Sequence, residues 1–163
     1  MQRVVLVRHN SYLFKGTVEE NLKMAKPDAT KEEMEAVLQK VNLLGFLQTQ
    51  DGLQTQLLEK ASNLSGGQCQ RLVIARALLR TDSAVYIFDE AASNIDVESE
   101  ELIMNVIHEL AKTKTVLLIS HRLANVVKSD KIYFLKDGEI KESGKHDELM
   151  SPVSYTHLTL PTN

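Results

Sequence analysis

The residues best placed to do chemistry are a serine with two glycines and, one helix and one strand later, two adjacent carboxylates. Ser65, Gly66 and Gly67 stand where a helix is expected to begin, and the unpaired N–H groups of a helix start suit a phosphate. Asp89 and Glu90 end an apolar strand. One carboxylate there can hold Mg²⁺, and its neighbour can orient an attacking water.

Each of these features also has an ordinary structural interpretation. Ser65 can be a helix cap and no more, and Asp89 with Glu90 can be solvated charges at a strand end. His121 follows the apolar strand expected at 115–119; it can bond a phosphate, or simply begin a helix without a ligand. Ligands of open α/β sheets bind where the strands end, and parallel strands end at one edge. We therefore expect His121 and Glu90 at the same edge, which favours the functional interpretation.

The pattern of apolar residues predicts the elements that position these groups. Capping boxes open helices after Thr17, Thr30 and Ser65, and Asp96 can cap a fourth. Apolar strands are expected at 4–7, 84–88 and 115–119, a hairpin at 132–141 around Asp137-Gly138, and a last helix at 147–150. Continuous apolar strands joined by helices predict an α/β fold with a parallel sheet covered on both faces.

Composition limits the class of protein. The 163 residues are enough for one domain, and 43% hydrophobic with 25% charged residues is ordinary for a globular protein. The net charge of -3 gives no basic field, so nucleic acid is not an expected partner. The single cysteine, Cys69, excludes an internal disulfide, and no run approaches the length of apolar residues that spans a bilayer.

Together these segments resemble the nucleotide-binding domain of ATP-binding cassette (ABC) transporters of the exporter type. Leu64-Ser65-Gly66-Gly67-Gln68 resembles the signature motif, residues 84–89 resemble Walker B with Glu90 as catalytic carboxylate, and His121 resembles the switch histidine. Ser93-Asn94-Ile95-Asp96 is similar to the D-loop, residues 13–21 to the segment after the Q-loop, and residues 144–149 to the end of exporter domains. The match covers residues 3–151.

The resemblance implies a partial P-loop NTPase (ABC ATPase) fold, with a mostly parallel sheet core and an inserted helical subdomain. Residues 1–9 would be a core strand with the Q-loop region, and 10–80 the helical subdomain with the signature motif. Residues 81–151 would be the RecA-like core, and 152–163 a non-native or disordered tail.

The resemblance also implies ATP and Mg²⁺ as cofactors, with hydrolysis coupled to transmembrane export at the cytoplasmic face of the membrane. Glu90 and His121 would be catalytic, Asp89 would bind Mg²⁺, and the nucleotide contacts would be Ser65, Gly66, Gly67, Gln68 and Asp96. Two such domains, as a homodimer or heterodimer, sandwich two ATP molecules head to tail. The signature therefore serves the partner's ATP, and Gly67→Asp is expected to repel that phosphate. The other implied partner is the exporter's transmembrane domain.

Four departures from the family pattern qualify this. The Gly-rich Walker A loop and the aromatic residue that stacks on adenine are not among the 163 residues. We therefore expect the carboxyl-terminal part of a domain, inactive alone, with sheet faces left bare. His9 stands at the place of the Q-loop glutamine, an Mg²⁺ contact whose geometry and charge histidine does not reproduce. Ala61 stands where exporters often have glycine. The alternatives are a non-transport ABC ATPase, or a regulatory module lending only its signature motif to a partner's ATP site.

Overall fold

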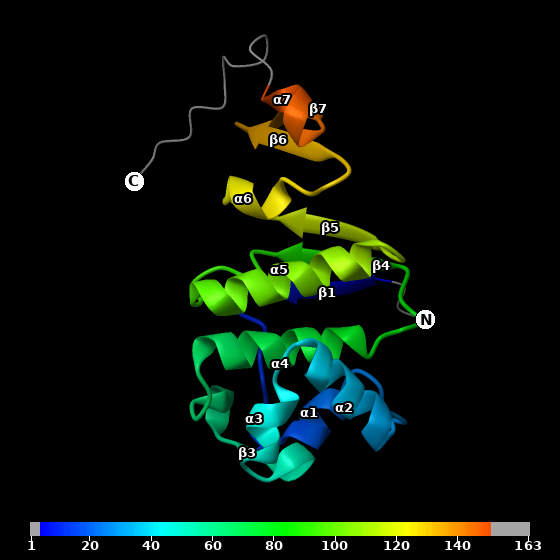
Figure 1. The fold of residues 1–163 in the computed structure, drawn as a ribbon, viewed down its shortest axis with the longest axis vertical. Coiled ribbons are helices and arrows are strands. Elements are labelled where there is room, and N and C mark those ends of the chain that lie inside the picture. The colour runs from blue at the N-terminus through cyan, green and yellow to red at the C-terminus, as the bar shows by residue number, and fades with distance from the viewer. Residues whose placement is uncertain (1–3, 151–163) are drawn as a thin grey trace. The chain divides into compact units, whose positions relative to one another are not determined.

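The computed structural model describes residues 4–150, and within them the chain divides after Ile119 into two compact units. Figure 1 shows the order of the elements along the chain. The sequence-based prediction for residues 152–163 lies outside the described residues. Within residues 4–150, no helix has the length and apolar character needed to cross a membrane.

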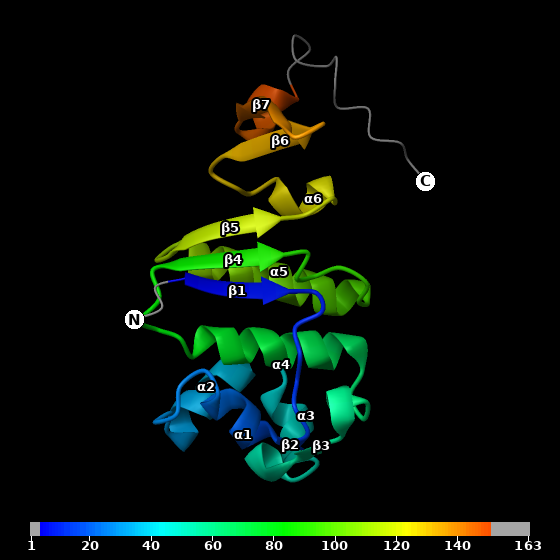
Figure 2. The same cartoon turned by 180° about the vertical axis from the view of Figure 1, so that it is seen from behind.

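The first unit contains a three-stranded parallel sheet. Its strands are β1 (Val4–Arg8), β4 (Val85–Asp89) and β5 (Thr115–Ile119), in the order β1-β4-β5. Asp89 lies opposite Arg8 on one side and Ile119 on the other. The three arrows of Figure 2 point the same way, so the carboxyl ends meet at one edge. The predicted parallel sheet is confirmed, with β4 one residue later than expected.

The two faces of this sheet differ. Tyr86 and Phe88 are fully buried on the face that α4 (Gly66–Leu78) and α5 (Val97–Ala111) cover. The alternate residues make up the opposite face, which Figure 2 shows in front of α5, and its large exposed side chains are Val4, Leu6, Leu117 and Ile119 at 45 to 49%. The cover on both faces that the apolar pattern predicts is therefore wrong for the described residues, because both long helices pack on the same side. The bare sheet face expected from the family resemblance is confirmed on the other side.

A helical region lies between β1 and β4 in sequence. It consists of β2 (Gly16–Thr17), α1 (Val18–Lys23), α2 (Lys31–Lys40), α3 (Leu44–Gln48), the 3-10 turns η1 (Gly52–Gln54) and η2 (Glu59–Ala61), β3 (Gln56–Leu57) and α4. The capping boxes predicted at Thr17 and Thr30 are confirmed, with Glu20 and Glu33 as their reciprocal partners. These caps fix where α1 and α2 begin, since each one satisfies N–H groups that no helix can satisfy by itself.

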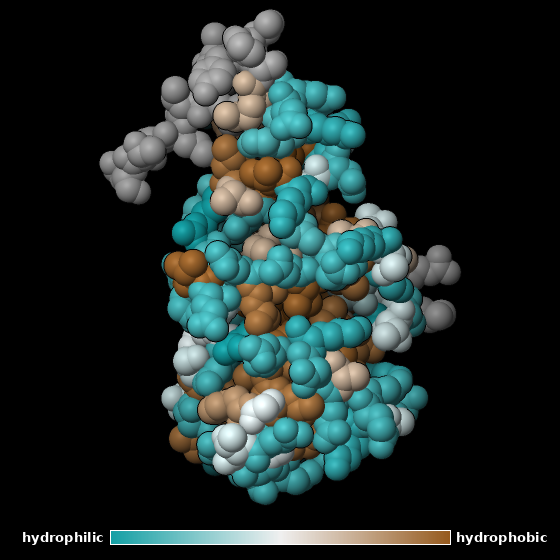
Figure 3. All heavy atoms as spheres, viewed as in Figure 1, coloured by the Kyte–Doolittle hydropathy of each residue, from teal (hydrophilic) through white to brown (hydrophobic). Residues whose placement is uncertain are grey.

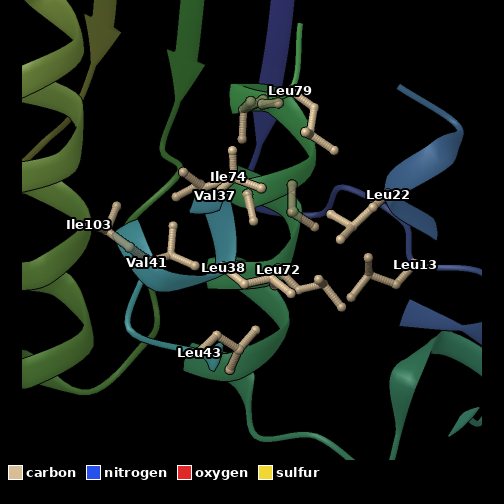
Figure 4. Close-up of a cluster of buried hydrophobic side chains, with 14 of the residues drawn as sticks. Leu13, Leu22, Val37, Leu38, Val41, Leu43, Leu72, Ile74, Leu79 and Ile103 are labelled. Carbon is tan, nitrogen blue, oxygen red and sulfur yellow. The ribbon is translucent and has the colours of Figure 1, made fainter. Parts of the chain in front are cut away.

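Helix α4 joins the helical region to the sheet. Its buried side chains Leu72 and Ile74 belong to the cluster in Figure 4, together with Leu22, Leu38 and Leu43 from the helical region. It also contacts β1 and α5. Figure 3 shows hydrophobic surface continuing between α5 and α4 on this side of the molecule. The middle and end of α4 therefore belong to one continuous core.

The second unit is small. It holds α6 (Leu123–Val126), the antiparallel hairpin β6 (Ile132–Lys136) with β7 (Glu139–Gly144), and α7 (His146–Leu149). Asp137 and Gly138 form the predicted turn, both with positive φ (53° and 79°). Asparagine, aspartate and glycine tolerate this conformation best, which is why the Asp-Gly pair predicts a hairpin.

Candidate functional site

The signature segment forms a capped helix start. Ser65 is the N-cap of α4: its Oγ accepts a hydrogen bond from the Gln68 N–H at 3.2 Å, and Gln68 Oε1 accepts one from the Ser65 N–H at 2.9 Å. This confirms the predicted cap. The first N–H groups of any α-helix have no acceptor within it, so the turn presents donors at Gly66 and Gly67. The role of Ser65 and Gln68 toward a nucleotide stays a prediction.

The loop that leads into this turn is also fixed. The Asn63 side chain accepts a hydrogen bond from the Leu58 N–H and donates one to the Gln56 carbonyl, each at 2.9 Å. Lys60 and Ala61 both have positive φ (55° and 52°), and Ala61 is fully buried. A left-handed backbone is unfavourable for any residue with a Cβ atom. This gives a physical reason why glycine suits position 61.

The two glycines of the signature segment lack side chains for different reasons. A Cβ atom added at Gly66 would meet nothing within 4 Å. A Cβ at Gly67, which is buried, would lie 2.8 Å from Asp96 Oδ1 and 3.0 Å from Ser99 Cβ, and would overlap Ser99 Oγ. The residue pattern suggests one reason for both glycines, which is access for a ligand. The structure gives Gly67 a second: close packing of α4 against α5.

Asp96 caps the helix on the other side of this contact. Its Oδ2 accepts a hydrogen bond from the Ser99 N–H at 2.8 Å. Hydrogen bonds from the backbone and side chain of Ser99 hold the pKa of Asp96 below its usual range, and the charge of Arg71 lowers it further. The cap predicted at Asp96 is confirmed, and the expected contact with nucleotide stays a prediction.

Glu90 follows the last residue of β4 in a constrained conformation. Its φ is 49°, in the left-handed region. Its N–H donates to the Ile119 carbonyl at 3.0 Å, while its own carbonyl accepts from the N–H and the hydroxyl of Ser93, at 3.0 and 2.8 Å. Unfavourable backbone angles persist where surrounding bonds over-determine them, often at functional sites. The backbone thus fixes where the Glu90 carboxylate leaves the sheet.

Asp89 has a positively charged neighbour. Arg8 Nε lies 3.8 Å from Asp89 Oδ2, and the two side chains are 57% and 39% exposed. The His9 N–H donates to the Asp89 carbonyl at 3.2 Å, so the Q-loop position adjoins this strand end. No group of three or more His, Cys, Asp or Glu side chains within residues 4–150 could hold a metal. One carboxylate suits Mg²⁺ that is also bound by phosphate oxygens, and the nearby guanidinium opposes it.

His121 lies two residues beyond β5, in the second unit. The register of the sheet, with Asp89 opposite Ile119, confirms that β4 and β5 end at the same edge. Within the second unit, Ser120 Oγ accepts a hydrogen bond from the Arg122 N–H at 3.1 Å. The catalytic role of His121, and its meeting with Glu90, stay predictions.

Four residues of this site were missed by sequence reasoning: Arg8, Asn63, Arg71 and Ser99. Ser99 had a signal, because it stands three residues after the cap Asp96, where an N-cap side chain finds its N–H partner. Arg71 stands one turn after Gly67, where the two residues share a helix face. Arg8 and Asn63 act through bonds that close only in the folded chain, and no local pattern marks them.

Comparison with known proteins gives the class. A family model described as ABC transporter matches residues 1–93. An uncharacterized ABC transporter ATP-binding protein of Haemophilus influenzae is 55% identical over 149 residues, which are 91% of this chain and 26% of that protein. An ATP-dependent lipid A-core flippase of Vibrio vulnificus strain CMCP6 is 43% identical over 147 residues, 89% of this chain and 25% of the flippase.

The fold agrees. A solved structure of a bacterial Atm1-family ABC exporter with ATP bound matches with a TM-score of 0.82 at 30% identity, over 90% of this chain and 26% of that one. The chain therefore belongs to the ABC transporter family and has a partial P-loop ABC ATPase fold. It spans about a quarter of the length of these relatives.

Proposed function

We propose that this chain is the part of an exporter's nucleotide-binding domain that supplies the signature motif and the catalytic carboxylate, and that the whole protein couples ATP hydrolysis to export. The observation that carries the proposal is the pairing of two preformed features: a doubly capped signature turn and a Glu90 backbone locked at the strand edge. The relatives named as a flippase and an exporter support transport. None of the named relatives favours a non-transport ATPase.

Each residue then has a distinct role. Glu90 orients the attacking water and accepts its proton. Asp89 would hold Mg²⁺, which would supply charge neutralisation at the phosphate oxygens; without the metal, Arg8 pairs with this carboxylate. His121 donates a hydrogen bond toward the terminal phosphate, and His9 contributes at most a water-mediated contact to the metal. Glu90, Asp89 and His121 serve the nucleotide of their own domain.

The signature turn serves a different nucleotide. Ser65 and Gly66 are exposed at the helix start, where a hydroxyl, a backbone N–H and the side-chain amide of Gln68 can bind a phosphate. The backbone N–H of Gln68 is already bonded to Ser65 Oγ. We assign these contacts to ATP held by a second nucleotide-binding domain, identical or not. The transmembrane domain is the other partner, which puts the domain at the cytoplasmic face of the membrane. Residues 10–80 act as the helical subdomain and 81–151 as the core.

A chimera tests this proposal. The segment of the Vibrio vulnificus flippase that matches this chain is replaced by the corresponding residues of this chain, and ATP turnover is measured in lipid nanodiscs. We expect turnover in the chimera and a loss of about 100-fold or more in its Glu90→Gln variant, the size typical of a lost general base. ATP binding should survive, because Glu90 acts on water and not on the nucleotide.

The matched control is Glu101→Gln, which removes an exposed carboxylate from α5 and should leave turnover unchanged. A chimera that binds ATP and turns it over equally well with Glu90→Gln would contradict the assignment of Glu90. A folded chimera that binds ATP but never hydrolyses it, while the flippase itself does, would contradict the proposed function.

A further inference from the structure

The starts of α4 and α5 meet at a close contact, where a side chain larger than that of glycine would force its neighbours to shift. Position 67 is buried, and any Cβ there would overlap Ser99 Oγ and lie 2.8 Å from Asp96 Oδ1. Both neighbours are themselves held: Asp96 Oδ2 accepts from the Ser99 N–H at 2.8 Å, which fixes the cap of α5. The start of α4 is thus packed against the Asp96 and Ser99 side chains at the start of α5, with no side chain contributed by position 67.

A second set of bonds holds the same turn from the other side. Arg71 Nε donates to the Gly67 carbonyl at 3.3 Å, and Arg71 Nη1 donates to the Asn42 carbonyl, just past α2, at 3.1 Å. The charge of Arg71 also acts on Asp96. Guanidinium groups hold several acceptors in a fixed geometry. The first turn of α4 is therefore tied to the end of α2 and to the start of α5.

The chain from Glu90 to Asp96 connects this contact to the carboxylate edge, which is the sheet edge where β4 ends at Asp89 and Glu90 follows. It begins at the left-handed Glu90, whose N–H bonds β5, and it ends at the cap Asp96. Both ends of the segment are fixed, and its last residue lies against Gly67. A displacement of the segment 90–96 would therefore move Asp96 against Gly67 and so displace the first turn of α4.

We infer that Asp96 and Ser99 are positioning residues that clamp the first turn of α4 to the start of α5, so that the segment 90–96 and the signature turn move as one element. This inference rests on the proposed function for its consequence: the state of one ATP site would be passed to the turn that contacts the partner's ATP. In this inference Asp96 acts on the signature turn through Gly67, whether or not it also contacts the nucleotide.

Amide spectra of the chain without nucleotide test the clamp. We compare Gly67→Ala with the matched control Gly66→Ala, which adds the same methyl group where nothing lies within 4 Å. In Gly67→Ala the amide signals of both 65–68 and 90–99 should shift, and hydrogen exchange at Gln68 and Ser99 should accelerate by about tenfold, as expected for overpacking. In Gly66→Ala the shifts should stay within the first turn of α4.

Two further variants separate a clamp from simple damage to the helix. Ser99→Ala removes the hydroxyl that faces Gly67 and should shift the amides of 66–68, although they are remote in sequence. Adding Ser99→Gly to Gly67→Ala should slow the exchange at Gln68 again, since the two Ser99 atoms are gone and only the approach to Asp96 Oδ1 remains; a double-mutant cycle measures this coupling.

The inference is overturned if Gly67→Ala and Gly66→Ala give the same confined shifts, or if Ser99→Gly brings no recovery. If Gly67→Ala does not fold, the Ser99→Ala variant is the test. Unchanged amide signals of residues 66–68 in Ser99→Ala would then refute the clamp. No arm of this test uses ATP, so its failure would leave the proposed catalytic role of Glu90 untouched.

Discussion

The signature turn, residues 64–68, and the carboxylate edge differ in how many bonds within the chain hold them in place. Bonds from the chain itself surround the signature turn: its capping box, Asn63 in the preceding loop, Arg71 within α4 and the contact of Gly67 with α5. At the carboxylate edge the backbone of Glu90 is fixed, but Asp89 faces an exposed arginine. The adjoining sheet face is apolar and open.

This difference has a functional meaning in a head-to-tail pair of domains. A motif that acts on another domain's nucleotide is useful only if it is rigid before that domain arrives, because flexibility would be lost on binding. A carboxylate that acts on its own domain's nucleotide can rely on neighbours within that domain. The open sheet face beside Asp89 is where such neighbours would pack.

The largest expected effect contrasts the two faces of the sheet. Phe88→Ala removes a fully buried ring and should lower the free energy of unfolding by about 3 to 5 kcal/mol. Leu117→Ala, on the open face at 49% exposure, should cost less than about 1 kcal/mol and should reduce self-association. Urea denaturation and light scattering measure both quantities. Equal costs would show that the open face is covered in solution.

A smaller effect is expected at the signature cap. Ser65→Ala removes the acceptor for the Gln68 N–H and should lower the free energy of unfolding by about 1 kcal/mol. Thr30→Ala removes the equivalent acceptor from α2 and should cost about the same. In the chimera, however, only Ser65→Ala should weaken the response to ATP. If both variants weakened it equally, the signature cap would have no role beyond stability.

The pH dependence of stability should show the Asp96 cap. Because its pKa is lower in the folded chain than the unfolded value of about 3.9, its contribution is present near neutral pH and is lost as pH falls through the folded pKa. The gap in unfolding free energy between the natural chain and Asp96→Asn should therefore shrink below about pH 4. Glu19 and Glu33, whose pKa values are also lowered, act equally in both chains. A gap independent of pH would contradict the cap's charge.

The smallest effect concerns the ion pair at the carboxylate edge. Arg8→Gln should change the free energy of unfolding by no more than about 0.5 kcal/mol, because both side chains are substantially exposed. Arg80→Gln, which breaks a comparable surface contact with Asp82, is the matched control. A loss several times larger for Arg8→Gln would mean that this edge is more rigid than the exposed pair suggests.

Local rules explain which parts the sequence could predict. The caps at Thr17, Thr30, Ser65 and Asp96 need only side chains within three residues, so their spacing was sufficient. The apolar strands were predicted from continuous apolar runs, and their parallel order from the helices expected between them. The apolar pattern alone did not predict the bare face of the sheet, since an apolar strand has the same pattern whether or not a helix covers it; that expectation came from the family resemblance.

The contacts that join distant segments were beyond local rules. Gly67 meets Ser99, and Arg8 meets Asp89, only because the chain folds back over a helix and a strand. The glycine pair was visible, but the packing that separates Gly66 from Gly67 depends on the position of α5. The only sign of the positive φ at Ala61 was that the family often has glycine at this position, since glycine adopts positive φ readily.

The central claim is that the signature turn of this chain binds a nucleotide held by another domain. Gly67→Asp is a poor probe, because any side chain at 67 collides with α5. Gly66→Asp is better: position 66 is open, and aspartate is favourable in a first helical turn. In the Glu90→Gln chimera, spin-label distances should show that Gly66→Asp leaves ATP binding near normal but abolishes ATP-driven closure of the two domains. Closure as complete as in the chimera without Gly66→Asp would contradict the claim.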